Sequence, residues 1–77
     1  MAKNQRFLIK WREQGQPVID AIIFAESEKD ALIKLRDRLL TDCGIGYHYL
    51  WVMRVRNETT DENHLYIKRI NDVIETL

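Results

Sequence analysis

Residues 27–42, SEKDALIKLRDRLLTD, read as one amphipathic helix that lies between two strand-rich segments. Ser27 is a favourable N-cap, because its hydroxyl can accept a hydrogen bond from the free amides of the first turn. Gly44 can adopt the left-handed conformation that ends a helix. At about 100° per residue, one helix face collects the apolar side chains. We expect this face to enter the core; it consists of Ala31, Leu32, Leu35 and Leu39, with Cys43 at its end. Ile33 and Leu40 lie on the far side of the helix, where a terminal segment or a binding partner would cover them.

The segment before the helix predicts a β-hairpin. Residues 6–12, RFLIKWR, alternate apolar and basic side chains, and residues 17–25, PVIDAIIFA, form a second strand after a turn. One register places Lys10 opposite Asp20, which is a favourable cross-strand pair. A shift by a single residue would turn Asp20 toward the core, where an unpaired carboxylate is costly. The expected pairs are therefore Phe7 with Ile23, Ile9 with Ala21 and Trp11 with Ile19.

The segment after the helix, residues 47–56 (YHYLWVMRVR), has the strongest strand composition in the chain. Strict alternation divides it into two sides. The side that we expect to face the core carries Tyr47, Tyr49, Trp51, Met53 and Val55. The other side carries His48, Leu50, Val52, Arg54 and Arg56. The three aromatic residues could also stack on nucleic-acid bases, but their position favours the core.

Residues 65–69, LYIKR, predict a fourth strand, and a short helix follows from Ile70 with Asn71 as its cap. The alternative is a single helix that begins near Thr60 and runs to the end of the chain. With the strand, residues 1–77 form one α+β domain. It is an antiparallel sheet with one main helix packed on one face, in the order β-β-α-β-β-α.

The face of the sheet away from the main helix is expected to be apolar at its centre and basic at its rim. Its apolar residues are Leu8, Ile22, Phe24, Leu50 and Val52. The rim carries the residues that we predict to bind a partner: Arg6, Lys10, Arg12, His48, Arg54 and Arg56. Exposed apolar area is costly, so the C-terminal helix, a second copy of the chain or another protein should cover the centre. The rim could bind acidic protein groups or phosphates.

Composition argues against several classes of function. Twelve basic and twelve acidic residues cancel, so bulk charge favours neither a nucleic-acid nor a membrane partner. Cys43 is the single cysteine, and neither it nor the two histidines have the spacing of a metal site. The chain has no nucleophile motif and no phosphate-binding loop, so we expect neither an enzyme nor a cofactor. Without a long apolar run or a signal-peptide pattern, we expect a cytoplasmic protein.

Two segments, FAESEKDAL (residues 24–32) and VMRVR (residues 52–56), resemble a family of very small phage proteins built as β-β-α-β. The nearest likeness is to the T-odd coliphage inhibitors of bacterial RNA polymerase. The resemblance implies that Arg54 and Arg56 bind an acidic surface of the polymerase. Some anti-CRISPR inhibitors share the hairpin and the acidic helix start.

These observations lead us to expect a non-enzymatic phage or mobile-element protein that inhibits a machine of a bacterial host. RNA polymerase is the first target and a CRISPR effector the second. A small nucleic-acid-binding domain is an alternative, and its affinity would fall steeply as salt rises. A structural homodimer, joined through the second face of the sheet, is another.

Overall fold

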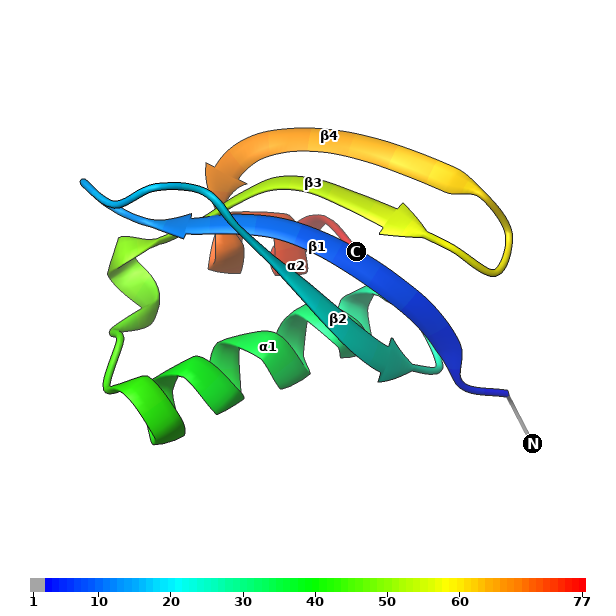
Figure 1. Ribbon diagram of the computed structural model, residues 1–77, viewed down its shortest axis with the longest axis horizontal. Coiled ribbons are helices and arrows are strands. Elements are labelled where there is room, and N and C mark those ends of the chain that lie inside the picture. The colour runs from blue at the N-terminus through cyan, green and yellow to red at the C-terminus, as the bar shows by residue number, and fades with distance from the viewer. Residues whose placement is uncertain (1–2) are drawn as a thin grey trace.

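The computed structural model describes residues 3–77 and contains a four-stranded antiparallel sheet with two α-helices (Figure 1). Along the chain the elements are β1 (Gln5–Glu13), β2 (Ile19–Ala25), α1 (Glu28–Cys43), a 3-10 turn η1 (Tyr47–Tyr49), β3 (Leu50–Asn57), β4 (Glu62–Arg69) and α2 (Ile70–Thr76). The strand order in the sheet is β2-β1-β3-β4. The α+β class and the order β-β-α-β-β-α are confirmed.

Helix α1 begins and ends where its sequence predicts. The Ser27 hydroxyl accepts a hydrogen bond from the Asp30 amide at 3.1 Å. Gly44 has a φ of 67°, and its own amide donates to the Leu40 carbonyl at 3.2 Å, which closes the last turn. The predicted apolar face is buried. Cys43 is exposed and does not extend that face.

The β1–β2 hairpin has the predicted register, with Lys10 opposite Asp20 and Trp11 opposite Ile19. β2 begins at Ile19 and not at Pro17. The expectation that Ile19 is a core residue is wrong, because its side chain is 49% exposed at the start of an edge strand.

β3 departs from strict alternation at Met53. The ladder to β1 pairs Lys10 with Arg54 but Trp11 with Val52, so Met53 is an extra residue in a β-bulge. The bulge turns Leu50 and Val52 into the core, where Val55 is also buried. The prediction that Trp51 and Met53 face the core, with Leu50 and Val52 on the second face, is therefore wrong.

The bulge has a clear physical reason. Without it, burying Leu50 and Val52 would also direct Arg54 and Arg56 toward the core, because all four positions are even. A buried guanidinium without a partner is very costly. One inserted residue lets the strand bury its aliphatic side chains on both sides of the bulge and keep both arginines exposed.

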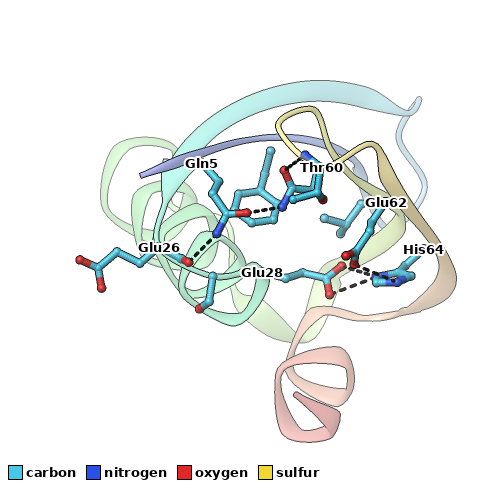
Figure 2. A pocket seen from close by; sticks show the side chains of 10 residues that line it. Gln5, Glu26, Glu28, Thr60, Glu62 and His64 are labelled. Carbon is cyan, nitrogen blue, oxygen red and sulfur yellow. Dashed lines mark hydrogen bonds and ion pairs between the residues drawn. The ribbon is translucent and has the colours of Figure 1, made fainter. Parts of the chain in front are cut away.

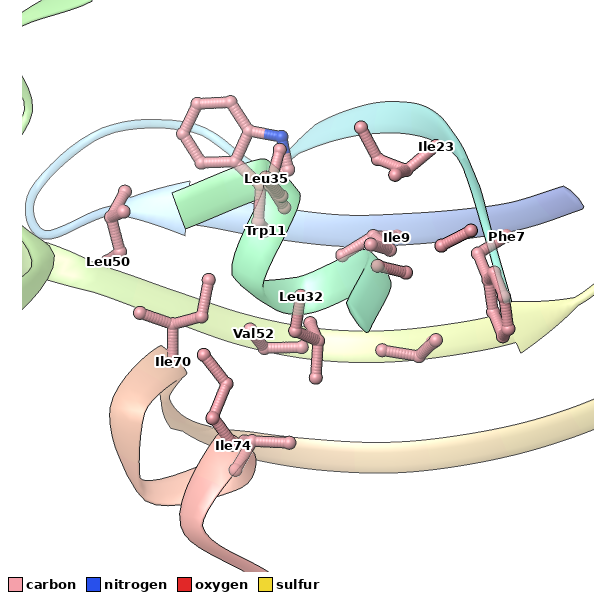
Figure 3. Packing of buried hydrophobic residues seen from close by; sticks show 14 of the residues in the cluster. Phe7, Ile9, Trp11, Ile23, Leu32, Leu35, Leu50, Val52, Ile70 and Ile74 are labelled. Atoms are coloured by element: carbon pink, nitrogen blue, oxygen red, sulfur yellow. The ribbon is translucent and has the colours of Figure 1, made fainter. Parts of the chain in front are cut away.

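The C-terminal segment forms a strand followed by a helix, as predicted, but β4 begins at Glu62 and not at Leu65. Asn71 is not the cap: it lies within α2, where its side-chain oxygen accepts from Arg36 Nη1 at 2.8 Å. The buried residues of α2 join those of α1 and the sheet in one cluster (Figure 3). Ile33 packs against this cluster, and Leu40 remains exposed.

Both helices lie on the same side of the sheet (Figure 1). Of the three possible covers for the second face, the C-terminal helix is therefore excluded. The helix α2 packs beside α1 because the apolar cluster there buries its apolar side chains, Ile70, Val73 and Ile74. Within residues 3–77, nothing covers the opposite face.

Ile67 in β4 has a φ of 55°, which a β-branched residue rarely adopts. It lies where the β3–β4 register shifts, beside the bulge at Met53. Its side chain is 57% exposed, so core burial does not compensate for the backbone strain. Replacing Ile67 with Gly should therefore raise the free energy of unfolding, by about 1 kcal/mol, in urea denaturation.

Ile67→Ala is the matched control for this substitution. It removes the same exposed side chain but keeps the Cβ atom that opposes a positive φ. A Gly variant no more stable than the Ala variant would contradict the strain argument.

Candidate functional site

The uncovered face of the sheet carries side chains from all four strands, in rows that follow from the strand registers. Directly opposite residues of antiparallel strands point to the same face, and the buried side chains of β1 define the helix side. One row consists of Ile22, Leu8, Arg56 and Asn63; the next of Asp20, Lys10, Arg54 and Leu65; the third of Arg12, Trp51 and Arg69. Phe24 and Arg6 form a fourth pair beside the first row. We call this surface the outer face.

The outer face concentrates positive charge. Its strand positions hold six basic residues, Arg6, Lys10, Arg12, Arg54, Arg56 and Arg69. They hold a single acidic residue, Asp20. The chain as a whole has no net charge. The fold therefore gathers basic residues on this face, although basic and acidic residues are equal in number in the sequence.

Three of these basic side chains are already paired. Arg6 Nε lies 3.1 Å from Glu58, Arg56 Nη2 lies 2.7 Å from Asp61, and Lys10 Nζ lies 3.9 Å from Asp20. The hydrogen bond from Arg56 to Asp61, and then the charge of Asp61, raise the pKa of Arg56. The charge of Arg56 is thus engaged by the β3–β4 loop.

Arg54 and Arg12 differ from the other arginines of β1 and β3. Neither forms an ion pair with any residue from 3 to 77. Arg54 is exposed and lies between Lys10 and Leu65 in its row. Arg69 lies with its guanidinium 5.4 Å from the centre of the Trp51 ring. The outer face therefore has free positive charge at its middle.

The apolar part of the outer face is mostly aliphatic. Ile22, Phe24 and Leu65 are 45%, 57% and 66% exposed, and Leu8 is half-buried between the strands. Large apolar side chains exposed together on one surface are typical of binding sites. Phe24 is the exposed aromatic residue among them, at the open edge of β2.

The structure brings together five of the six predicted site residues, namely Arg6, Lys10, Arg12, Arg54 and Arg56. His48 is not among them. It lies in η1, where the Tyr49 amide donates to Gly46 and the chain has not yet entered β3. Tyr47 and Tyr49 are exposed there, so their predicted place in the core is also wrong.

Leu65 and Arg69 belong to the site but were not predicted. The period-two spacing from residue 65 to residue 69 was a signal that could have found them. The side of β4 on which they lie depends on its pairing with β3, which the sequence alone does not show.

A polar pocket of about 230 Å³ lies on the helix side, where the N-terminus of α1 meets the start of β4 (Figure 2). Its carboxylates come from Glu26, Glu28 and Glu62. Glu28 accepts from His64 Nδ1, at 3.1 and 3.2 Å from its two oxygens. Asn57 donates to Gln5 at 2.6 Å. Gln5 in turn donates to the Glu26 carbonyl at 2.9 Å. These bonds join β4 and β1 to the start of α1 and β3 to β1, and they account for the polar lining.

Tyr66 lies beside this pocket and contacts Glu28. Burial, and then the charge of Glu28 and a hydrogen bond to it, raise the pKa of Tyr66 to about 12. The folded state therefore holds the tyrosine proton more tightly than the unfolded chain does. The resulting stability is fully present below a pH of about 10 and is lost as pH rises toward the folded value.

Tyr66→Phe should remove this part of the alkaline destabilisation. We expect the wild-type protein to lose stability between the unfolded and folded pKa values of Tyr66, and the variant to lose less. Urea denaturation over a series of alkaline pH values measures the difference. Parallel loss of stability in both proteins would show that Tyr66 does not ionise as described.

No cluster of three or more metal-ligating side chains occurs among residues 3–77. No helix in the described part of the chain is long and apolar enough to cross a membrane. Comparison with known proteins gives no match: no family model, no curated protein and no solved structure matches this chain.

Proposed function

We propose that this chain is a non-enzymatic binding protein whose outer face docks on the surface of another protein. The observation that carries the proposal is an uncovered sheet face with exposed aliphatic side chains and free arginine charge. Protein interfaces combine apolar contacts with polar ones, and arginine is enriched in them. On the outer face the free charge lies on the central strands and the exposed apolar side chains lie on the two edge strands. The partner surface is then acidic opposite the middle of the outer face and apolar opposite its edges.

Arg54 is the first anchor in this proposal. Its neighbours in the row, Lys10 and Leu65, offer charge on one side and apolar contact on the other. Its own guanidinium is not paired with any residue in the described range. Arg56 has to leave Asp61 before it can bind a carboxylate of the partner, so it contributes less net affinity.

The resemblance of residues 24–32 and 52–56 to small phage inhibitors makes bacterial RNA polymerase the first target. A CRISPR effector is the second. The chain would act in the cytoplasm of the bacterial host, and it would inhibit by occupying an acidic surface that the machine needs.

A nucleic-acid partner is the second candidate, favoured by the six basic residues on the outer face. Phosphate contacts need only such charges. Single-stranded nucleic acid also requires aromatic platforms for the bases, and here Phe24 is the exposed one while Arg69 lies over Trp51. The exposed apolar side chains of the outer face are mostly aliphatic, and this favours a protein partner.

Arg54→Ala should weaken binding to purified bacterial RNA polymerase by about 2 kcal/mol. That loss is roughly a thirty-fold rise in Kd. Arg56→Ala should have a smaller effect, because this guanidinium is already engaged by Asp61. Biolayer interferometry measures both variants.

Arg38→Ala is the matched control, because Arg38 is exposed on α1, away from the outer face. Circular dichroism confirms that each variant is folded. Equal affinity of the folded Arg54→Ala variant and the wild type would contradict the assignment. Binding to a single-stranded oligonucleotide but not to protein, with a steep salt dependence, would replace it with the nucleic-acid function.

A further inference from the structure

The open edge of β2 carries backbone groups that no neighbouring strand pairs, and their positions follow from the hydrogen bonds of β1. The Arg6 amide donates to Thr59 Oγ1 at 3.1 Å, and the Arg6 carbonyl accepts from the Glu58 amide at 2.8 Å. Both groups of Arg6 therefore point away from β2. Arg6 and Phe24 are directly opposite, so they form a non-hydrogen-bonded pair of the antiparallel ladder.

Because such pairs alternate along a ladder, the next two non-hydrogen-bonded pairs are Leu8 with Ile22 and Lys10 with Asp20. The amides and carbonyls of Asp20, Ile22 and Phe24 then point to the open edge. The hydrogen bond from Lys34 Nζ to the Phe24 carbonyl, at 3.2 Å, agrees with this direction.

Lys34 of α1 reaches the Phe24 carbonyl at one end of this edge. Along the rest of its length the edge lacks the devices that usually protect a sheet edge from association. The β1–β2 register runs without a shift, and Asp20 is the single charged residue of the strand. Ile19, Ile22 and Phe24 are all exposed. The opposite edge, β4, is different: it contains a register shift, a residue with positive φ and several charged side chains. Native proteins protect exposed edges in these ways, so the unprotected edge marks an interaction site.

We propose that β2 pairs with β2 of a second copy of this chain, antiparallel and about a two-fold axis through Ile22. The two sheets then form one continuous eight-stranded sheet. In this register Ile22 lies opposite Ile22 of the second copy, and Phe24 lies opposite Asp20. Asp20, Ile22 and Phe24 of each copy, whose backbone groups point to the edge, then each lie opposite a residue of the other copy.

The charges and side chains of the strand fit a second copy. The centre of the pairing is apolar and uncharged, so neither copy brings a charge against the other there. The two Asp20 side chains are offset from each other by the register, and each already has its own Lys10 at 3.9 Å. A strongly charged partner strand would find no complementary charge along this edge. The inference does not rest on the proposed function, because it is argued from the unpaired backbone edge of β2 and not from the arginines of the outer face.

Sedimentation velocity of the full chain over a wide concentration range tests the dimer. Wild-type protein should dimerise as concentration rises. Ile22→Lys and Ile22→Glu should each be monomeric at concentrations where the wild type is dimeric, because the two-fold axis brings like charges face to face. An equimolar mixture of the two variants should dimerise again, since it places Lys opposite Glu.

Leu65→Lys is the control, because it adds the same charge to an exposed site of the outer face at the other edge, and it should leave the dimer intact. Circular dichroism confirms the fold of every variant. A monomeric wild type at all concentrations would overturn the proposal, as would a dimer that survives both substitutions at Ile22. A mixture that stays monomeric would overturn the register, and loss of the dimer in Leu65→Lys would place the contact on the outer face.

Discussion

The extra residue at Met53 lets β3 bury its aliphatic side chains and expose its arginines. Strict alternation along the strand would not allow both. The strand contains aliphatic residues that need burial at positions 50, 52 and 55 and arginines that need water at positions 54 and 56. Alternation would place Leu50 and Val52 on the same face as both arginines. With the bulge, the apolar residues of β3 reach the core, and the arginines join the basic residues of β1 on the other side. The composition of both faces of the sheet depends on this one irregularity.

The separation of charge follows from the same geometry. β1 contributes Arg6, Lys10 and Arg12 on alternate positions, and the bulge brings Arg54 and Arg56 opposite Lys10 and Leu8. Four acidic residues lie instead around the N-terminus of α1, where the helix dipole favours negative charge: Glu26, Glu28, Asp30 and Glu62. A chain with no net charge thus presents one strongly basic surface, which bulk composition cannot reveal.

Local signals were sufficient for much of the fold. The caps of α1, the hairpin register and the β4–α2 boundary follow from Ser27, Gly44, the Lys10–Asp20 pair and the helical spacing after Ile70. The faces of β3 could not be predicted, because a bulge leaves no mark in the composition of a strand. The side on which α2 packs was equally inaccessible, since it depends on the space that α1 leaves beside the core. For the site, β1 was predicted correctly because its alternation is regular, whereas His48 was misplaced because η1 interrupts the expected strand.

Methyl NOE spectroscopy of the isotope-labelled protein tests whether the bulge directs the aliphatic residues of β3 into the core and its arginines to the outer face. The structure predicts contacts from the Val52 and Val55 methyl groups to core side chains of the helices, and none of these for the Met53 methyl group. Contacts from Met53 to the helices, with Val52 contacting the residues of the outer face, would contradict it. In that case β3 alternates without a bulge, and Leu50 and Val52 lie on the outer face beside Arg54 and Arg56.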